Sequence, residues 1–248
     1  MSKLLIVEES TILCGIFKRL LEQDGGFNFD IAQTYKEAQE YLHKYRYEFS
    51  VVSRTLTDAS HGEIIALLNK HNVAPIVYTT SIDEDLIESF ESANVVEYIL
   101  RHRYDNVKYV LGRLNQLKAN KQRTVLIAHE SEIYRRYLKQ NLALHNFKVI
   151  IVDSAYEAIQ KLEVHKDINL LIVNHGLAQV PGLEEVNGLE LVRRVREMKK
   201  DNLKIIALAE ESNSYQTSFY LNEGADDYLI NQFSRDEFYV RVYQNIQN

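Results

Sequence analysis

The stretch KLLIVEES, Lys3–Ser10, decides the fold because a related stretch, RTVLIAHES, returns at Arg123–Ser131. Each is a short apolar run followed by polar residues and a serine. A second pair has the same spacing: FSVVS at Phe49–Ser53 matches NLLIVN at Asn169–Asn174. One sequence offset relates both pairs, which indicates an internal repeat of about half the chain.

A third pair lies near the end of each repeat, where VVEYILR at Val95–Arg101 matches ADDYLIN at Ala225–Asn231. Its offset is larger, so the second copy has gained residues, most of them in the loop Asn174–Gly188. A repeat of roughly 120 residues has the size of a domain. We therefore expect two domains, residues 1–120 (the first copy) and residues 121–248 (the second copy).

Short apolar runs alternate with segments of helical periodicity in both copies, which predicts five βα units in each. Runs that are apolar on both faces are typical of a parallel sheet covered by helices on both sides, with right-handed crossovers. The expected strands are Leu4–Val7, Phe27–Ile31, Ser50–Ser53, Pro75–Thr79 and Val95–Ile99, then Thr124–Ala128, Lys148–Val152, Leu170–Asn174, Lys204–Leu208 and Asp227–Ile230. The last helix of the first copy is expected at Arg103–Lys121 and runs almost directly into the second copy.

Composition bounds the class of protein. The chain has 248 residues, 46% of them hydrophobic, and a net charge of −6. Neither copy has the basic excess of a nucleic-acid binder, and no apolar run is long enough to span a membrane, so we expect a cytoplasmic protein without nucleic-acid partners. The single cysteine, Cys14, is expected to be buried on a helix face.

Five βα units that open with an apolar strand, an acidic pair and a serine, and that close with GADDYLI before NQF at Gly224–Phe233, resemble the receiver domain of bacterial response regulators. The resemblance covers nearly the whole chain, twice. It implies two flavodoxin-like α/β domains, each a parallel five-stranded sheet in the order 2-1-3-4-5. It also implies a pocket where two carboxylates and an acceptor aspartate bind Mg²⁺ and phosphate, helped by a hydroxyl and a lysine.

Carried onto the first copy, the resemblance puts Glu8 and Glu9 at the acidic pair, Ser53 at the acceptor, Thr80 at the hydroxyl and Arg101 at the lysine. Ser53 has no carboxylate for a metal ion or an acyl phosphate. Arginine does not reproduce the compact ammonium of lysine. Glu8 and Glu9 are only a weak Mg²⁺ candidate, and we expect no cofactor and no catalytic residue.

In the second copy the same positions hold His129 and Glu130, Asn174, Ala209 and Asn231. Four of the five residue types have lost their chemistry, so we expect two degenerate receivers. His129 with His175 is a weak metal candidate, since no ligand spacing supports it. Asp58 is expected to be an ordinary loop acid, and Gly25–Gly26 a helix C-cap.

Tyr98 and Tyr228 stand at the family's switch aromatic, on the face formed by the fourth helix, fifth strand and fifth helix of each repeat. Packing alone would also explain both tyrosines. In relatives this face dimerises or docks a partner, so the resemblance implies protein partners: a sensor kinase, an output domain or a second copy of the chain.

The leading hypothesis is a non-catalytic tandem pseudo-receiver of two-component signalling that acts through protein interaction or dimerisation. The resemblance extends to receiver pairs that precede GGDEF diguanylate cyclase domains, but these residues contain no GGDEF motif, so any cyclase output lies outside them. Two alternatives stay open. One is a phosphorylation-competent regulator with a substitute acceptor, and the other is a receiver that senses a small ligand in an emptied pocket.

Overall fold

Two compact units make up the protein, Met1–Ala119 (the first unit) and Asn120–Asn248 (the second unit). The computed structural model describes residues 2–81, 94–101, 105–198, 202–209 and 214–247. Each unit contains one five-stranded parallel sheet.

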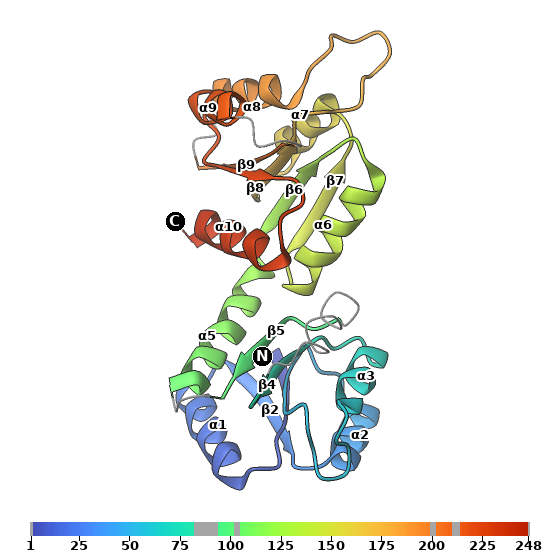
Figure 1. Ribbon diagram of the computed structural model, residues 1–248, viewed down its shortest axis with the longest axis vertical. Coiled ribbons are helices and arrows are strands. Elements are labelled where there is room, and N and C mark those ends of the chain that lie inside the picture. The colour runs from blue at the N-terminus through green and yellow to red at the C-terminus, as the bar shows by residue number, and fades with distance from the viewer. Residues whose placement is uncertain (1, 82–93, 102–104, 199–201, 210–213, 248) are drawn as a thin grey trace. The chain divides into compact units, whose positions relative to one another are not determined.

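The first sheet has the strand order β2-β1-β3-β4-β5, and every neighbouring pair is parallel. Helices α1 and α5 cover one face of this sheet, and α2 and α3 cover the other (Figure 1). The strands are β1 (Ser2–Val7), β2 (Phe27–Ala32), β3 (Phe49–Val52), β4 (Pro75–Thr79) and β5 (Glu97–Leu100). The helices are α1 (Thr11–Asp24), α2 (Tyr35–Lys44), α3 (Glu63–Lys70) and α5 (Asp105–Asn120).

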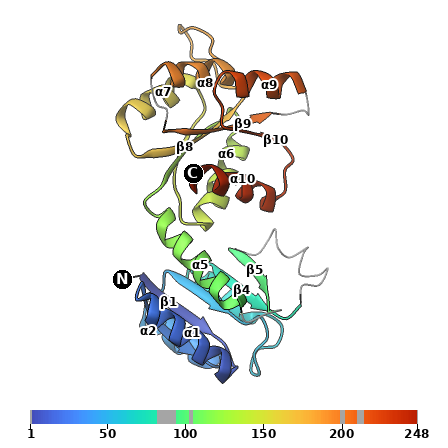
Figure 2. The ribbon, with the colours of Figure 1, turned by 90° about the vertical axis from the view of Figure 1, so that its left-hand side faces the viewer.

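The second sheet has the order β10-β9-β8-β6-β7, which read from β7 is again 2-1-3-4-5. Helices α6 and α10 lie on one face, and α7, α8 and α9 on the other (Figure 2). The strands are β6 (Thr124–Ala128), β7 (Lys148–Val152), β8 (Ile168–Asn174), β9 (Lys204–Ala209) and β10 (Asp227–Ile230). The helices are α6 (Glu132–Leu144), α7 (Ala155–Val164), α8 (Gly188–Glu197), α9 (Ser214–Asn222) and α10 (Arg235–Gln247).

Both sheets confirm the predicted fold and strand order. The largest difference lies in the fifth strand, predicted at Val95–Ile99 and observed at Glu97–Leu100. Val95 and Val96 are buried, but the ladder with β4 begins only at Glu97, which pairs with Ile76. Part of the predicted helix Arg103–Lys121 lies outside the described residues.

The serine after each polar pair has a structural role. Ser10 and Ser131 are the N-caps of α1 and α6, and each side chain accepts a backbone N–H of the first turn. This is the preferred use of serine at a helix start. Gly25 ends α1 with a φ of 65°, as the C-cap prediction requires, and Cys14 is buried as predicted. No helix in the described part of the chain is long and apolar enough to cross a membrane.

Candidate functional site

The sheet registers define which residues of the two units are equivalent. In the first unit Val7 pairs with Val52, and in the second Ala128 pairs with Val173. The residues that follow these pairs are therefore equivalent: Glu8 with His129, and Ser53 with Asn174. All four lie at the carboxyl edge of their sheets, where doubly wound α/β folds place their functional groups.

The register corrects one predicted position. Thr79 pairs with Leu100 on β5, as Ala209 pairs with Ile230 on β10, so Thr79 and not Thr80 is equivalent to Ala209. Thr80 is exposed. Thr79 is buried, and its Oγ1 donates to the carbonyl of Ser81 at 3.0 Å. The sequence held this signal, because the offset between Tyr98 and Tyr228 also relates Thr79 to Ala209.

An internal ion pair occupies the centre of the first unit's candidate site. Arg101 Nη2 lies 2.6 Å from Glu8 Oε2, and Glu8 is only 1% exposed. Arg101 Nε also donates to the carbonyl of Tyr78 at 2.9 Å, and its guanidinium lies over the Tyr78 ring. The other carboxylate oxygen of Glu8 accepts the N–H of Ser10 at 3.0 Å. Both oxygens of this carboxylate are therefore held by partners inside the protein.

The remaining polar groups of this site contact other parts of the first unit. Glu9 turns toward the loop after β3, where its Oε2 accepts the N–H and the hydroxyl of Thr57. Ser53 Oγ donates to the carbonyl of Thr55 at 2.8 Å. Mg²⁺ prefers several oxygen ligands in octahedral geometry, whereas Glu8, Glu9 and Ser53 are directed to three different partners. Within the described ranges no three His, Cys, Asp or Glu side chains form a possible metal cluster.

A neutral histidine stands at the equivalent place in the second unit. His129 is 4% exposed, stacks on Tyr134 with ring centroids 5.0 Å apart, and accepts the N–H of Ser131 at Nδ1. Burial, together with the positive charge of Arg135, lowers the pKa of His129 to about 4. Because Nδ1 is an acceptor, the ring proton belongs on Nε2, which disfavours a metal ion at that nitrogen.

The other residues of this second site are also uncharged or turned to its rim. Asn174 is fully buried, and its amide nitrogen donates to the carbonyl of Gly176 at 3.1 Å. The side-chain oxygens of Asn174 and Asn231 have no hydrogen-bond partner among the described residues. Glu130 is exposed and covers Gly176, where an added Cβ would lie 2.4 Å from its carboxylate. Ala209 contributes no polar side-chain group.

The two switch-position tyrosines pack inward to different degrees. Tyr98 is buried in the apolar cluster beneath α2 and α3, and Tyr228 is half-buried, 6.4 Å from Tyr220 between ring centroids. The last strand of each unit is tied to the last helix by an ion pair, Glu97 with Arg113 and Asp227 with Arg241.

Two residues have roles that differ from the sequence-based prediction. Asp58 is not an ordinary loop acid, because its carboxylate accepts the N–H groups of Tyr35 and Lys36 at the start of α2. The Tyr35 N–H lowers the pKa of Asp58. His175 Nδ1 lies 3.0 Å from the hydroxyl of Tyr220, which accounts for this histidine without a metal ion.

Known proteins resemble the chain in both sequence and fold. The family described as the response regulator receiver domain matches residues 125–243. The response regulator ArlR of Staphylococcus haemolyticus is 30% identical over 118 residues, which cover 48% of this chain and 50% of that protein. A chemotaxis protein CheY homolog of Campylobacter jejuni is 29% identical over 112 residues. These residues cover 44% of this chain and 82% of the length of that protein. This chain thus spans about half the length of the Staphylococcus relatives that it matches.

One similar solved structure extends over both units. The crystal structure of a two-component system response regulator/GGDEF domain protein is 29% identical, with a TM-score of 0.85, and the match covers 100% of this chain and 98% of that one. Strand order and helix placement define both units as flavodoxin-like α/β domains. Residues 125–243 are a response regulator receiver domain, and the first unit is a second domain with the receiver fold.

Proposed function

We propose that the protein is a tandem pseudo-receiver, a non-catalytic regulatory module of two-component signal transduction that acts through protein–protein interaction. The ion pair between Arg101 and Glu8 is the observation that carries this proposal. It neutralises the one buried carboxylate at the strand ends of the first unit and occupies both of its oxygens together with Ser10. A phosphorylation cycle needs a carboxylate to attack phosphorus and others to bind Mg²⁺. In the first unit Ser53 stands at the acceptor position and Glu8 is paired with Arg101.

The second unit supports the same proposal by a different route. Its strand-end groups are a neutral histidine, two amides and an alanine, so no buried charge is left to bind a divalent cation or to accept phosphate. Asn174 has nearly the shape of an aspartate but lacks its charge. We infer that both sites are structural remnants, with Glu8, Arg101, His129 and Asn174 serving local packing.

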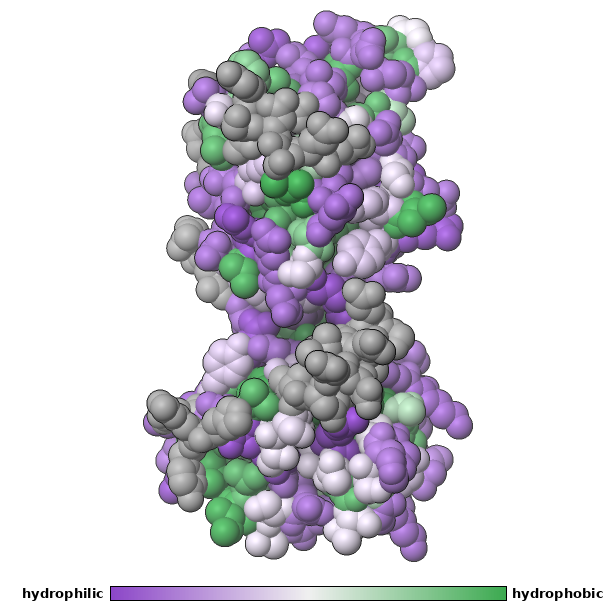
Figure 3. All heavy atoms as spheres, in the orientation of Figure 1, coloured by the Kyte–Doolittle hydropathy of each residue, from purple (hydrophilic) through white to green (hydrophobic). Residues whose placement is uncertain are grey.

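Exposed apolar residues support a role in association. In the second unit four of them come from the three elements α9, β10 and α10. Figure 3 shows hydrophobic surface, in green, near the β10 edge of the sheet on the face in view. Apolar side chains exposed on neighbouring elements are typical of an interaction surface. These exposed residues are Phe219, Leu221, Ile230 and Val240.

The partner in this proposal is an output domain, a sensor kinase or a second copy of the chain, and the location is the cytoplasm. Two similar solved proteins bear names that combine a response regulator with a GGDEF domain, and both matches cover the whole of this chain. We therefore propose that the module controls a diguanylate cyclase that lies outside these residues.

Incubation of the purified chain with Mg²⁺ and acetyl phosphate tests this proposal, with intact mass as the readout and sedimentation velocity on the same samples. We expect no phosphoryl adduct and no change in oligomeric state. The double variant Ser53→Asp/Arg101→Lys is the positive control, because it restores the acceptor carboxylate and releases Glu8. An adduct on the unmodified chain would overturn the proposal and favour a regulator with a substitute acceptor.

A further inference from the structure

The N-terminus of α2 in the first unit holds a carboxylate supplied by the protein itself. Asp58, in the loop after β3, accepts the N–H of Tyr35 at 2.9 Å with one oxygen and the N–H of Lys36 at 3.1 Å with the other. The first N–H groups of a helix have no partner within the helix, and its dipole favours a negative charge there. The carboxylate of Asp58 satisfies both requirements.

The second unit repeats this helix start but has no carboxylate at the position of Asp58. Ser154 caps α7 as Thr34 caps α2, and each side chain accepts the N–H of a glutamate three residues on. Ala155 and Tyr156 are therefore the equivalents of Tyr35 and Lys36. In the loop after β8, Leu177 is buried like Leu56 in the first unit, at the offset that relates Ser53 to Asn174. That offset makes Gln179 the equivalent of Asp58, so an amide replaces the carboxylate.

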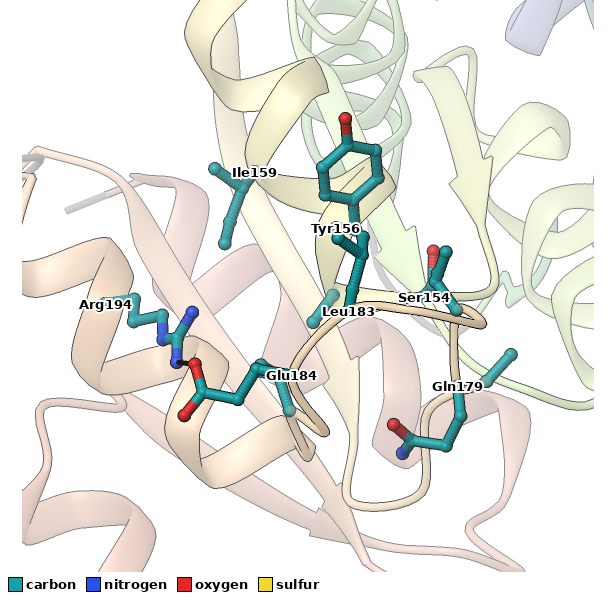
Figure 4. Close-up of a pocket in the computed structure, with 11 residues that line it drawn as sticks. Ser154, Tyr156, Ile159, Gln179, Leu183, Glu184 and Arg194 are labelled. Carbon is teal, nitrogen blue, oxygen red and sulfur yellow. Dashed lines mark hydrogen bonds and ion pairs between the residues drawn. The ribbon is translucent and has the colours of Figure 1, made fainter.

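A cavity of about 190 Å³ lies at this place in the second unit, between α7, α8 and the lengthened loop (Figure 4). Gln179 and Ser154 lie on one side of it, the ion pair of Arg194 with Glu184 on the other, and Tyr156 and Leu183 between them. Among the described residues no α7 N–H is recorded as donating to Gln179, whose amide nitrogen donates to the carbonyl of Leu177 at 3.3 Å.

Three hydrogen-bond donors at the cavity can receive an anion. Among the described residues, the N–H groups of Ala155 and Tyr156 have no recorded acceptor, and both residues line the cavity. Ser154 is 2% exposed and also lines it. Its Oγ already accepts the N–H of Glu157, so its own hydrogen is left to donate. These three donors are the equivalents of the two N–H groups that bind Asp58 in the first unit, together with the buried hydroxyl of Ser154.

The rest of the lining is mostly apolar and defines the body of the ligand. Ile159, Leu183 and Val186 contribute aliphatic walls, and Tyr156 contributes an aromatic ring. An apolar cavity of ~150 Å³ is known to hold benzene, so a cavity of 190 Å³ fits a ligand the size of benzoate. The nearby acids do not oppose this reading, because Glu184 is paired with Arg194 at 2.7 Å. Glu157 in the first turn of α7 is equivalent to Glu37 in the first turn of α2. In the first unit the carboxylate of Asp58 is bound at the helix start although Glu37 lies in the same turn.

We propose that this cavity binds the carboxylate of a small, largely apolar molecule at the N-terminus of α7, in the place that Asp58 fills in the first unit. The site lies apart from the degenerate phosphorylation pocket and shares no residue with it. A bound ligand would fix the loop 177–187 against α7 and α8, which gives the second unit an input that does not depend on phosphate.

The test is a titration of the ¹⁵N-labelled full chain with sodium benzoate at constant ionic strength, followed by amide NMR, with benzamide as the uncharged analogue. We expect the amide signals of Ala155 and Tyr156 to shift, with a dissociation constant on the order of a millimolar for a ligand of this size. Those of Tyr35 and Lys36 stay in place because Asp58 blocks them.

The variant Gln179→Asp supplies an internal carboxylate and should weaken benzoate binding by about tenfold or more. Gln160→Glu, an exposed change of the same charge further along α7, is the matched control and should leave the affinity within about twofold. Both positions are exposed, so neither change threatens the fold. Absent shifts at Ala155 and Tyr156, equal binding of benzamide, or an unaffected Gln179→Asp variant would each overturn the proposal.

Discussion

At the scale of single residues, Arg101 forms a buried ion pair with Glu8 whose contribution to stability can be measured. Removing its guanidinium by Arg101→Met leaves the carboxylate of Glu8, 1% exposed, without its counter-charge. Breaking a buried ion pair from one side costs about 3 kcal/mol, because the remaining charge stays desolvated. We expect urea denaturation to show a loss of that size in the free energy of unfolding.

The double variant Arg101→Met/Glu8→Gln separates this charge effect from lost packing. With no buried charge left, it should recover most of the stability that the single variant loses, since replacing a whole ion pair is far cheaper than breaking it. If Arg101→Met alone unfolded at the urea concentration of the unmodified chain, the ion pair would have no stabilising role.

His129 predicts a pH dependence of stability in the second unit. Its pKa is lowered to about 4, against an ordinary value of 6.5 in the unfolded chain, so protons bind the unfolded state more strongly. The contribution is complete above pH 6.5 and is lost as the pH falls toward 4. Between pH 7 and pH 5 the unmodified chain should lose about 2 kcal/mol more stability than His129→Gln. Urea denaturation at both pH values measures this difference, and equal losses in the two proteins would contradict it.

At the scale of elements, the approach of α8 to β8 depends on Gly188. A Cβ at this position would lie 2.0 Å from the carbonyl oxygen of Asn174 and 3.0 Å from the hydroxyl of Tyr220. Gly188→Ala must therefore push the helix away from the strand end, at a cost of about 3 kcal/mol. Gly15 on α1 is the matched control, because its added Cβ would meet nothing within 4 Å. Gly15→Ala should stabilise the chain by about 0.5–1 kcal/mol, and thermal denaturation of both variants checks the opposite signs.

Elements were also the scale at which the sequence was most informative. Apolar runs and their repeat predicted ten strands, because a doubly wound fold must bury such runs between helices. The strand order in each sheet came from the resemblance to receiver domains. Contacts of single side chains could not be predicted in this way. The partner of Glu8 is 93 residues distant, and the role of Asp58 depends on where its loop meets α2. Thr79 was missed by one position, although the offset between Tyr98 and Tyr228 also relates it to Ala209.

At the scale of the whole molecule, the two units retain one fold while their strand-end chemistry differs. The first unit keeps charged groups and pairs them internally, as Arg101 with Glu8. The second replaces them by neutral groups, among them His129 and Asn174. The core of each sheet needs only apolar strands, so either change leaves the fold intact. The proposed role in association therefore depends on the surface of the units.

Self-association should depend on the face formed by α9, β10 and α10 of the second unit. Val240 on α10 is 52% exposed, and Val164 at the end of α7 is 75% exposed. Val240→Glu and Val164→Glu therefore introduce the same charge on two different surfaces. A charge desolvated at the centre of an interface should weaken a dimer by about tenfold or more, whereas a charge outside it stays in water. Sedimentation velocity over a range of concentrations should show weaker dimerisation for Val240→Glu and none of this effect for Val164→Glu. Equal behaviour of the two variants would place the interface elsewhere, and an unmodified chain that stays monomeric would leave a separate output protein as the partner of this face.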